Sequence, residues 1–190
     1  MIRYRYHRAS ILFVGINPHP GSFRRKVPFS NNKTFWYLLS DAGLLRESRD
    51  ELRDDVALHR IYATRFNAIY GLGFVNLIDR PTRGIAELQY GEEIAGRRRL
   101  DRILLAQRPK VACFIGKVAF AKYMGTGDVG FGWQESIGRT KVFVMHFPLR
   151  GEASVRVREL RHVMAAAHGM RRSREPQKLL ASSAGGKGGR

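Results

Sequence analysis

Four short apolar runs constrain the fold of this chain more than any other feature of its sequence. They span residues 11–16, 73–78, 111–115 and 141–147. Because the first three are continuously apolar and do not alternate with polar residues, they are typical of strands that are covered on both faces. Such strands require helices on both sides of the sheet that they form.

Helical patterns separate the apolar runs. One begins at Phe35 and Trp36, which are expected in the core, and ends near Gly43. Others are expected over residues 87–107, 117–124 and 152–167, and the charged segment 46–65 is expected to form a surface helix followed by a loop. The alternation of strands and helices predicts an α/β fold: a three-layer α/β/α sandwich around a central, mainly parallel four-stranded sheet.

Charge and chain length suggest one folded domain and a tail. The 190 residues include 34 Lys and Arg against 16 Asp and Glu, a formal net charge of +18. Residues 1–168 are predicted to form the domain, and residues 169–190 a basic, disordered tail. Most of the positive charge therefore belongs to the domain. Such a surface attracts phosphate polyanions, although an ordinary basic enzyme carries the same charge.

Several classes of protein are disfavoured. No apolar run approaches the roughly 20 residues of a membrane-spanning helix. The apolar stretch that follows the basic N-terminal residues is too short for the core of a signal peptide. Cys113 lies within an apolar run and is expected to be a buried core residue. Since no Cys/His cluster has the spacing of a metal site, we expect neither a metal nor another cofactor.

Neutral polar side chains stand at three of the four strand ends. Asn17, Asn76 and His146 lie within or just after apolar runs, and ligands bind at the carboxyl ends of parallel strands. A carboxamide has a donor and an acceptor, so it can pair with the edge of a nucleobase. Each residue also has a structural interpretation: Asn17 as a turn residue before Pro18, and Asn76 and His146 as partners of nearby backbone groups.

Taken together, the strand-end motifs resemble those of the mismatch-specific uracil-DNA and thymine-DNA glycosylases, a branch of the uracil-DNA glycosylase superfamily. The motifs are Gly15-Ile16-Asn17-Pro18, Val27-Pro28-Phe29 followed by Phe35-Trp36, the segment from Gly73 to Thr82, and Ile115-Gly116-Lys117-Val118-Ala119. The resemblance covers residues 11–165. It implies a uracil-DNA glycosylase-like catalytic domain and a monofunctional glycosylase. Such an enzyme hydrolyses the N-glycosidic bond of a flipped-out uracil, here in a G:U mismatch, and thereby starts base-excision repair.

The resemblance also implies roles for individual residues. Asn17 falls at the position that holds the attacking water, and Phe29 at the position that stacks on the flipped base. Asn76 matches the position that reads the edge of the pyrimidine, while Ile16 and Pro18 contact the substrate beside it. An amide orients water but accepts its proton weakly, so catalysis would rest on stabilising the departing base and the sugar cation.

Two histidines depart from the mismatch-specific pattern. His19 replaces a small residue, so it either narrows the pocket against thymine or points into solvent. His146 stands where this branch commonly has an Asn-Pro-Ser triplet. Other uracil glycosylases use a histidine there to stabilise the uracil anion, which makes His146 a second catalytic candidate through a neutral imidazole donor.

Four further residues are expected to contact DNA. Leu149 or Arg150 falls where a wedge enters the base stack, and Lys117 and Arg80 lie at other strand ends. The implied partner is double-stranded DNA with a damaged or mismatched base. The protein is expected to be monomeric, independent of membranes, and cytoplasmic in association with a bacterial-type nucleoid. Asp79 is a weaker candidate for a general base, because the adjacent Arg80 suggests a structural ion pair.

Other functions remain open. In one alternative, the enzyme excises hypoxanthine, ethenocytosine or thymine in a G:T mismatch. In another, the chain is a non-catalytic module that binds damaged DNA on the same fold. A Rossmann-like nucleotide-binding protein is disfavoured, because no Gly-x-Gly-x-x-Gly motif follows the first strand.

Overall fold

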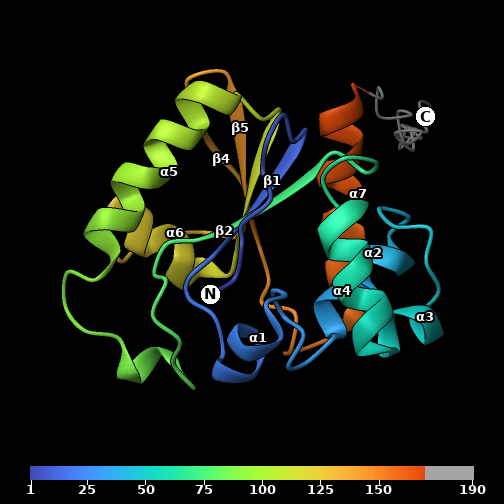
Figure 1. Cartoon of the computed structure of the whole chain (residues 1–190). Helices are drawn as coiled ribbons and strands as arrows, with labels where there is room; N and C mark the ends of the chain where they lie inside the picture. The colour runs from blue at the N-terminus through green and yellow to red at the C-terminus, as the bar shows by residue number, and fades with distance from the viewer. Residues whose placement is uncertain (170–190) are drawn as a thin grey trace, which may run out of the picture.

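The computed structural model describes residues 1–169, and a five-stranded sheet forms its centre. The strands are β1 (Ile11–Gly15), β2 (Leu72–Asn76), β3 (Val111–Ile115), β4 (Gly132–Ile137) and β5 (Thr140–Met145). Their order in the sheet is β2-β1-β3-β5-β4, and only β4 runs antiparallel to its neighbour. The predicted α/β fold with a mainly parallel central sheet is confirmed (Figure 1).

The sheet has one strand more than the four that the sequence predicts. The additional strand, β4, pairs with β5 at the edge of the sheet, with Trp133 opposite Phe143. Its residues are half-buried or exposed, whereas every residue of β1, β2 and β3 is buried. An edge strand that is not covered on both faces needs no continuous apolar run, so β4 lacks the signal that identifies the central strands.

Helices cover both faces of the sheet. The helices are α1 (Pro20–Arg25), α2 (Thr34–Asp41), α3 (Arg49–Arg53), α4 (Asp55–Thr64), α5 (Glu93–Gln107), α6 (Lys117–Met124) and α7 (Ala153–His168), with a 3₁₀ turn, η1, at Ile85–Glu87. Helices α5 and α6 lie on one face, and α2, α4 and α7 lie on the other (Figure 1). None of the helices within residues 1–169 has the length and apolar character needed to cross a membrane.

The segment 46–65 forms two helices, not the predicted helix and loop. Ser48 caps α3 in a capping box with Glu51, and Asp54 caps α4 by accepting a hydrogen bond from the backbone of Ala57 at 2.6 Å. The expected loop is therefore mostly α4, which buries Leu58 and other apolar residues against the core. The predicted tail lies outside the described residues, apart from Gly169, which caps α7.

Alternate residues of the central strands build two cores, one on each face of the sheet. Phe13 packs in the core with Phe35 and Trp36, both fully buried as predicted, while Val14 packs in the core on the opposite face. Cys113 is also fully buried, which confirms its expected core role, and burial raises the pKa of its thiol.

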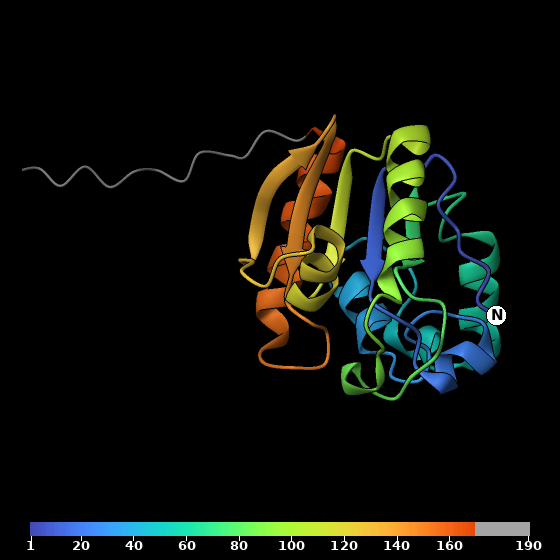
Figure 2. The ribbon, with the colours of Figure 1, turned by 90° about the vertical axis from the view of Figure 1, so that its left-hand side faces the viewer.

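The parallel strands all end at the same edge of the sheet (Figure 2). Strands β1 and β2 finish side by side, since Gly15 is the register partner of Asn76. The loops that follow β1, β2, β3 and β5 therefore meet at this edge, and the candidate site lies there.

Candidate active site

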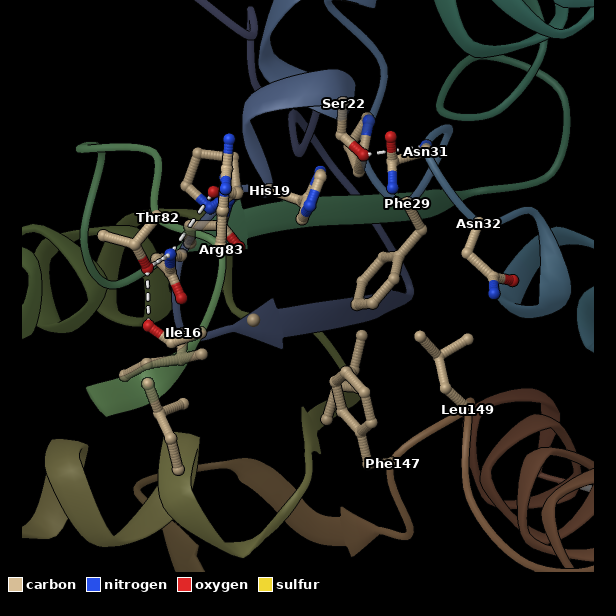
Figure 3. Close-up of a pocket in the computed structure, with 18 of the residues that line it drawn as sticks. Ile16, His19, Ser22, Phe29, Asn31, Asn32, Thr82, Arg83, Phe147 and Leu149 are labelled. Atoms are coloured by element: carbon tan, nitrogen blue, oxygen red, sulfur yellow. Dashed lines mark hydrogen bonds between the residues drawn. The ribbon is translucent and has the colours of Figure 1, made fainter. Parts of the chain in front are cut away.

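A pocket of about 240 Å³ opens at the carboxyl edge of the sheet, between the loops after β1, β2 and β5 (Figure 3). The predicted site residues that line it are Ile16, Asn17, Pro18, His19, Phe29, Asn76 and Leu149. The remaining predicted residues, His146, Arg150, Lys117 and Arg80, are not among its lining residues. A pocket for a drug-sized ligand usually measures about 300–1,000 Å³. This one suits a smaller ligand.

The carboxamide of Asn17 is held in one orientation. Its Nδ2 donates to the hydroxyl oxygen of Thr82 at 2.7 Å and to the carbonyl oxygen of Pro18 at 3.3 Å. The Thr82 hydroxyl donates its proton to the carbonyl oxygen of Gly84 at 2.9 Å, so towards Asn17 it acts as an acceptor (Figure 3). The nitrogen of the carboxamide is thus engaged, which leaves Oδ1 as the acceptor that Asn17 offers to the pocket.

Phe29 forms an aromatic wall of the pocket. Its backbone has a φ of +54°, an uncommon conformation for a residue with a side chain. The ring centroid lies 4.8 Å from that of Phe35 and 6.2 Å from that of Phe147. The indole nitrogen of Trp36 donates to the carbonyl oxygen of Pro28 at 2.7 Å. The core aromatic residues therefore fix the loop that presents this ring.

Asn76 is buried at the end of β2 and faces Gly15 on the neighbouring strand. A Cβ atom at position 15 would overlap the Oδ1 atom of Asn76, so the carboxamide occupies the space that a side chain there would fill. Both residues line the pocket. Glycine at position 15 is therefore needed to bring the amide of Asn76 beside the ligand site.

His19 combines its two predicted arrangements, because it lines the pocket and is also exposed. Its Nδ1 accepts a hydrogen bond from the backbone of Gly21 at 3.1 Å and caps α1. Next to it, the Ser22 hydroxyl accepts from the backbone of Asn31 at 3.0 Å. Ser22, Asn31 and Thr82 line the pocket although the sequence does not predict them as site residues. Ser22 lies within α1, whereas Asn31 and Thr82 lie in loops, where Asn and Thr are common for local reasons.

His146 is turned to α7. Its Nδ1 lies 2.6 Å from the Oε1 of Glu159, whose Oε2 accepts the backbone N–H of His146 at 3.0 Å. The imidazole also stacks on Phe131, with ring centroids 3.6 Å apart. When Nδ1 donates to the carboxylate, Nε2 of the neutral ring carries no proton. The imidazole N–H group, which the sequence predicts as a donor to the uracil anion, therefore points to Glu159.

Two charged residues of α7 fix the loop that follows β5. Glu159 binds its first residue, His146, as described above, and Arg156 donates to the carbonyl oxygens of Arg150 and Gly151 near its end. Both α7 residues are buried. The side chain of Leu149, midway along this loop, is 43% exposed and lines the pocket, with Phe147 next to it (Figure 3). The loop thus presents apolar groups at the pocket mouth on a fixed backbone.

Asp79 and Arg80 do not form the ion pair that the sequence predicts. The Asp79 carboxylate accepts from the hydroxyl of Tyr4 at 2.7 Å and from Arg99 at 2.5 Å. Arg80 instead pairs with Glu92 at 2.5 Å and holds the pKa of that carboxyl at about 2. The side chains of adjacent residues point in different directions at this turn, and each finds a partner from a distant segment.

The charged groups around the pocket are few. Arg83 lines it, and in the described part of the chain no carboxylate does. Lys117 lies beyond its lining, with its Nζ 4.7 Å from the centre of the Phe131 ring. Among residues 1–169, no group of three His, Cys, Asp or Glu side chains is arranged to hold a metal ion. The pocket therefore offers a ligand mainly neutral amides, hydroxyls and aromatic surface.

A comparison with known protein families gives a match over most of the chain. The model of the family described as the uracil DNA glycosylase superfamily matches residues 3–184. The matched segment contains all five strands, every described helix and the loops that form the pocket.

Proposed function

This chain belongs to the uracil DNA glycosylase superfamily, and from that membership we propose that it hydrolyses the N-glycosidic bond of uracil flipped out of a G:U mismatch. DNA glycosylase activity in base-excision repair and a DNA substrate are properties of the superfamily. The choice of uracil, the mismatch, and the mismatch-specific branch are our proposal. The observation that carries it is the Asn17 carboxamide, which Thr82 fixes in a small pocket beside Phe29 and Asn76.

Asn17 positions the attacking water in this proposal. Its Oδ1 accepts a hydrogen bond from the water, because Nδ2 is already bonded to Thr82 and Pro18. The bond between the sugar C1′ and the base breaks, the water oxygen bonds to C1′, and a water proton passes to the departing base. Since no carboxylate in the described residues lines the pocket, proton removal is not strongly assisted. The rate then depends on stabilising the leaving base and the oxocarbenium-like sugar.

The base lies against Phe29 and Asn76. Stacking on the Phe29 ring contributes about 1–3 kcal/mol and accepts any base, so it does not discriminate. Discrimination comes from hydrogen bonds to the base edge, which Asn76 makes, while Ile16 and Pro18 form adjacent walls. His19 stands at the same pocket and limits the space for a larger substituent on the base.

Leu149 is the wedge that fills the gap left by the flipped nucleotide. Its exposed side chain lines the pocket mouth, whereas Arg150 uses its carbonyl group to bind Arg156 and does not line the pocket. We assign Arg150, Lys117 and Arg80 to contacts with the DNA backbone, in keeping with the net charge of +18. A protein with this substrate acts as a monomer on nucleoid DNA in the cytoplasm.

An excision assay on end-labelled duplexes tests the proposal. The duplexes carry U:G, U:A, T:G, hypoxanthine or ethenocytosine, and a C:G duplex is the control. Alkali then cleaves each abasic site. We expect U:G to give the most product. A larger yield from another lesion would identify that lesion as the preferred substrate of the enzyme. If no duplex is cut while abasic DNA is still bound, the chain is a non-catalytic module that recognises damage.

A further inference from the structure

We propose that His19 donates a hydrogen bond from its Nε2 to a carbonyl oxygen of the flipped base, and so stabilises the negative charge that the base acquires as it departs. This makes His19 a catalytic residue, in addition to its effect on the space in the pocket. The inference rests on the proposed function, because it requires uracil to be released in this pocket.

Two prolines restrict the backbone that presents the imidazole. His19 lies between Pro18 and Pro20, and a residue that precedes a proline avoids the helical region. Its φ of −69° and ψ of 144° are the extended values that this rule predicts. Because Pro20 is the first residue of α1, His19 becomes the N-cap of that helix. The local sequence therefore sets the point on the pocket wall from which the side chain starts.

The cap of α1 determines which imidazole nitrogen carries the proton. The backbone N–H of Gly21 donates to Nδ1 of His19 at 3.1 Å, so Nδ1 has to offer a lone pair. A neutral imidazole has one N–H group and one acceptor nitrogen, and its proton is therefore on Nε2. Within residues 1–169, Nε2 has no hydrogen-bond partner. The ring thus offers a ligand one N–H donor in a defined tautomer.

This donor belongs to the same pocket as the proposed water and base sites. His19 lines the pocket together with Asn17 and Phe29, and Figure 3 shows its ring pointing from the loop after β1 in the direction of Phe29. The loop itself is anchored, since the backbone N–H of Thr82 donates to the carbonyl oxygen of Pro18 at 3.1 Å. A base that stacks on Phe29 therefore has the imidazole of His19 at its edge.

A donor at the edge of the base acts on the leaving group. When the bond between C1′ and the base breaks, its electron pair passes to the base and spreads onto the carbonyl oxygens. A hydrogen bond to such an oxygen becomes stronger as the charge grows, and a donor that is already in place needs no reorganisation during the reaction. A neutral imidazole can provide this bond while it keeps its proton.

His19 thereby supplies the donor that the sequence predicts at His146. Nδ1 of His146 faces Glu159 at 2.6 Å, and that ring does not line the pocket. In His19 the same atom accepts from a backbone group, so the N–H stays free. The branch that the sequence resembles has a small residue at position 19. The donor is therefore a feature of this chain.

Two substitutions separate the donor from the helix cap. Asparagine is a favoured N-cap residue whose Oδ1 can replace Nδ1, so His19→Asn keeps the bond to Gly21 but has no group at the position of Nε2. Glutamine reaches that position with an amide donor but is not a favoured N-cap residue, so His19→Gln keeps the donor and weakens the cap. His59→Asn is the control, because His59 is exposed on α4 and does not line the pocket.

Single-turnover excision of uracil or 5-fluorouracil opposite guanine tests the inference. We expect His19→Asn to slow the excision of uracil roughly tenfold, the low end for a hydrogen bond to a charged group, because the ring is exposed. His19→Gln should recover most of the rate, and His59→Asn should match the wild type. The loss on 5-fluorouracil should be smaller, since fluorine already stabilises the departing anion. The Kd for an uncut 2′-fluoro-deoxyuridine duplex should change less than the rate, because the charge develops only in the transition state.

A histidine that only caps α1 gives the opposite order of the two variants. His19→Asn would then excise uracil at the wild-type rate while His19→Gln is impaired, and this result would overturn the inference. An equal loss on uracil and 5-fluorouracil would overturn it as well, because the donor would not act on the leaving charge. Unfolding cannot imitate the expected result, since it lowers both rates equally. Failure of the proposed function looks different, because the wild type itself would then excise no uracil.

Discussion

The two sides of the pocket are fixed in different ways. On the side formed by the loops after β1 and β2, the functional groups are the amides of Asn17 and Asn76, and the buried hydroxyl of Thr82 fixes the amide of Asn17. On the side formed by the loop after β5, the groups are the exposed side chains of Phe147 and Leu149. There, the hydrogen bonds from α7 fix only the backbone and His146.

The difference follows from what each side has to supply. An amide has a direction, and a reversed amide presents a donor where an acceptor is required, so its orientation must be set by neighbouring groups. An apolar wedge has no such direction and needs only to be placed at the mouth. Changes on the amide side should therefore alter the chemical step or base choice, and changes on the apolar side should alter the engagement of duplex DNA.

Asn17→Ala should have the largest effect. It removes the acceptor that holds the water, and the loss of one such positioned group costs about 100-fold or more in rate. Single-turnover excision of uracil from a U:G duplex measures the loss, and binding to abasic DNA should be retained, because that contact does not need the water. Excision at the wild-type rate would show that another group positions the water.

Thr82→Val should have the next largest effect on the amide side. Valine keeps the shape of the side chain but offers no acceptor to Nδ2 of Asn17, so the carboxamide loses its fixed orientation. We expect kcat to fall roughly tenfold with little change in KM, the loss of one hydrogen bond that matters in the transition state. Thr82→Ser retains the hydroxyl and should restore most of kcat. Equal rates for the Val and Ser variants would contradict the orienting role.

Sequence patterns predict most strands of the sheet and the position of the two asparagines at the pocket. Apolar runs identify β1, β2, β3 and β5, and the continuous runs of β1, β2 and β3 are typical of strands that are covered on both faces. The strand-end rule then brings Asn17 and Asn76 to one pocket, and the structure places both there. These inferences succeed because they depend on local composition and on a general property of parallel sheets.

Local sequence patterns do not predict the hydrogen-bond partners of the residues at this edge of the sheet. Thr82 reaches Asn17 because the chain after β2 folds back, with the backbone N–H of Thr82 donating to the carbonyl oxygen of Pro18 at 3.1 Å. Tyr4 and Asp79 are 75 residues apart in the sequence. The prediction of an ion pair between Asp79 and Arg80 was wrong for the same reason, since adjacency in the chain does not bring two side chains together.

Leu149→Ala tests the apolar side. The variant removes the wedge while the loop stays anchored by α7, so excision from duplex DNA should fall about fivefold through a higher KM, in line with a modest unstacking penalty. Excision from single-stranded DNA needs no wedge and should not change. Leu105→Ala is the control, because Leu105 is 74% exposed on α5 and does not line the pocket. An equal effect of the two substitutions, or an equal loss on single strands, would rule out a wedge.

His146→Asn should have the smallest effect, although the sequence makes His146 a catalytic candidate. The imidazole does not line the pocket, and its Nδ1 faces Glu159 at 2.6 Å. The amide of an asparagine can still donate to that carboxylate, so the loop and Leu149 should keep their positions. We expect kcat on uracil to change by less than about threefold, within the range of a surface substitution that keeps its partner. A loss of about 100-fold, the scale of a group that stabilises an anion directly, would show that the ring turns to the pocket when DNA binds. In that case the loop after β5 would contribute to catalysis together with the amides of Asn17 and Asn76.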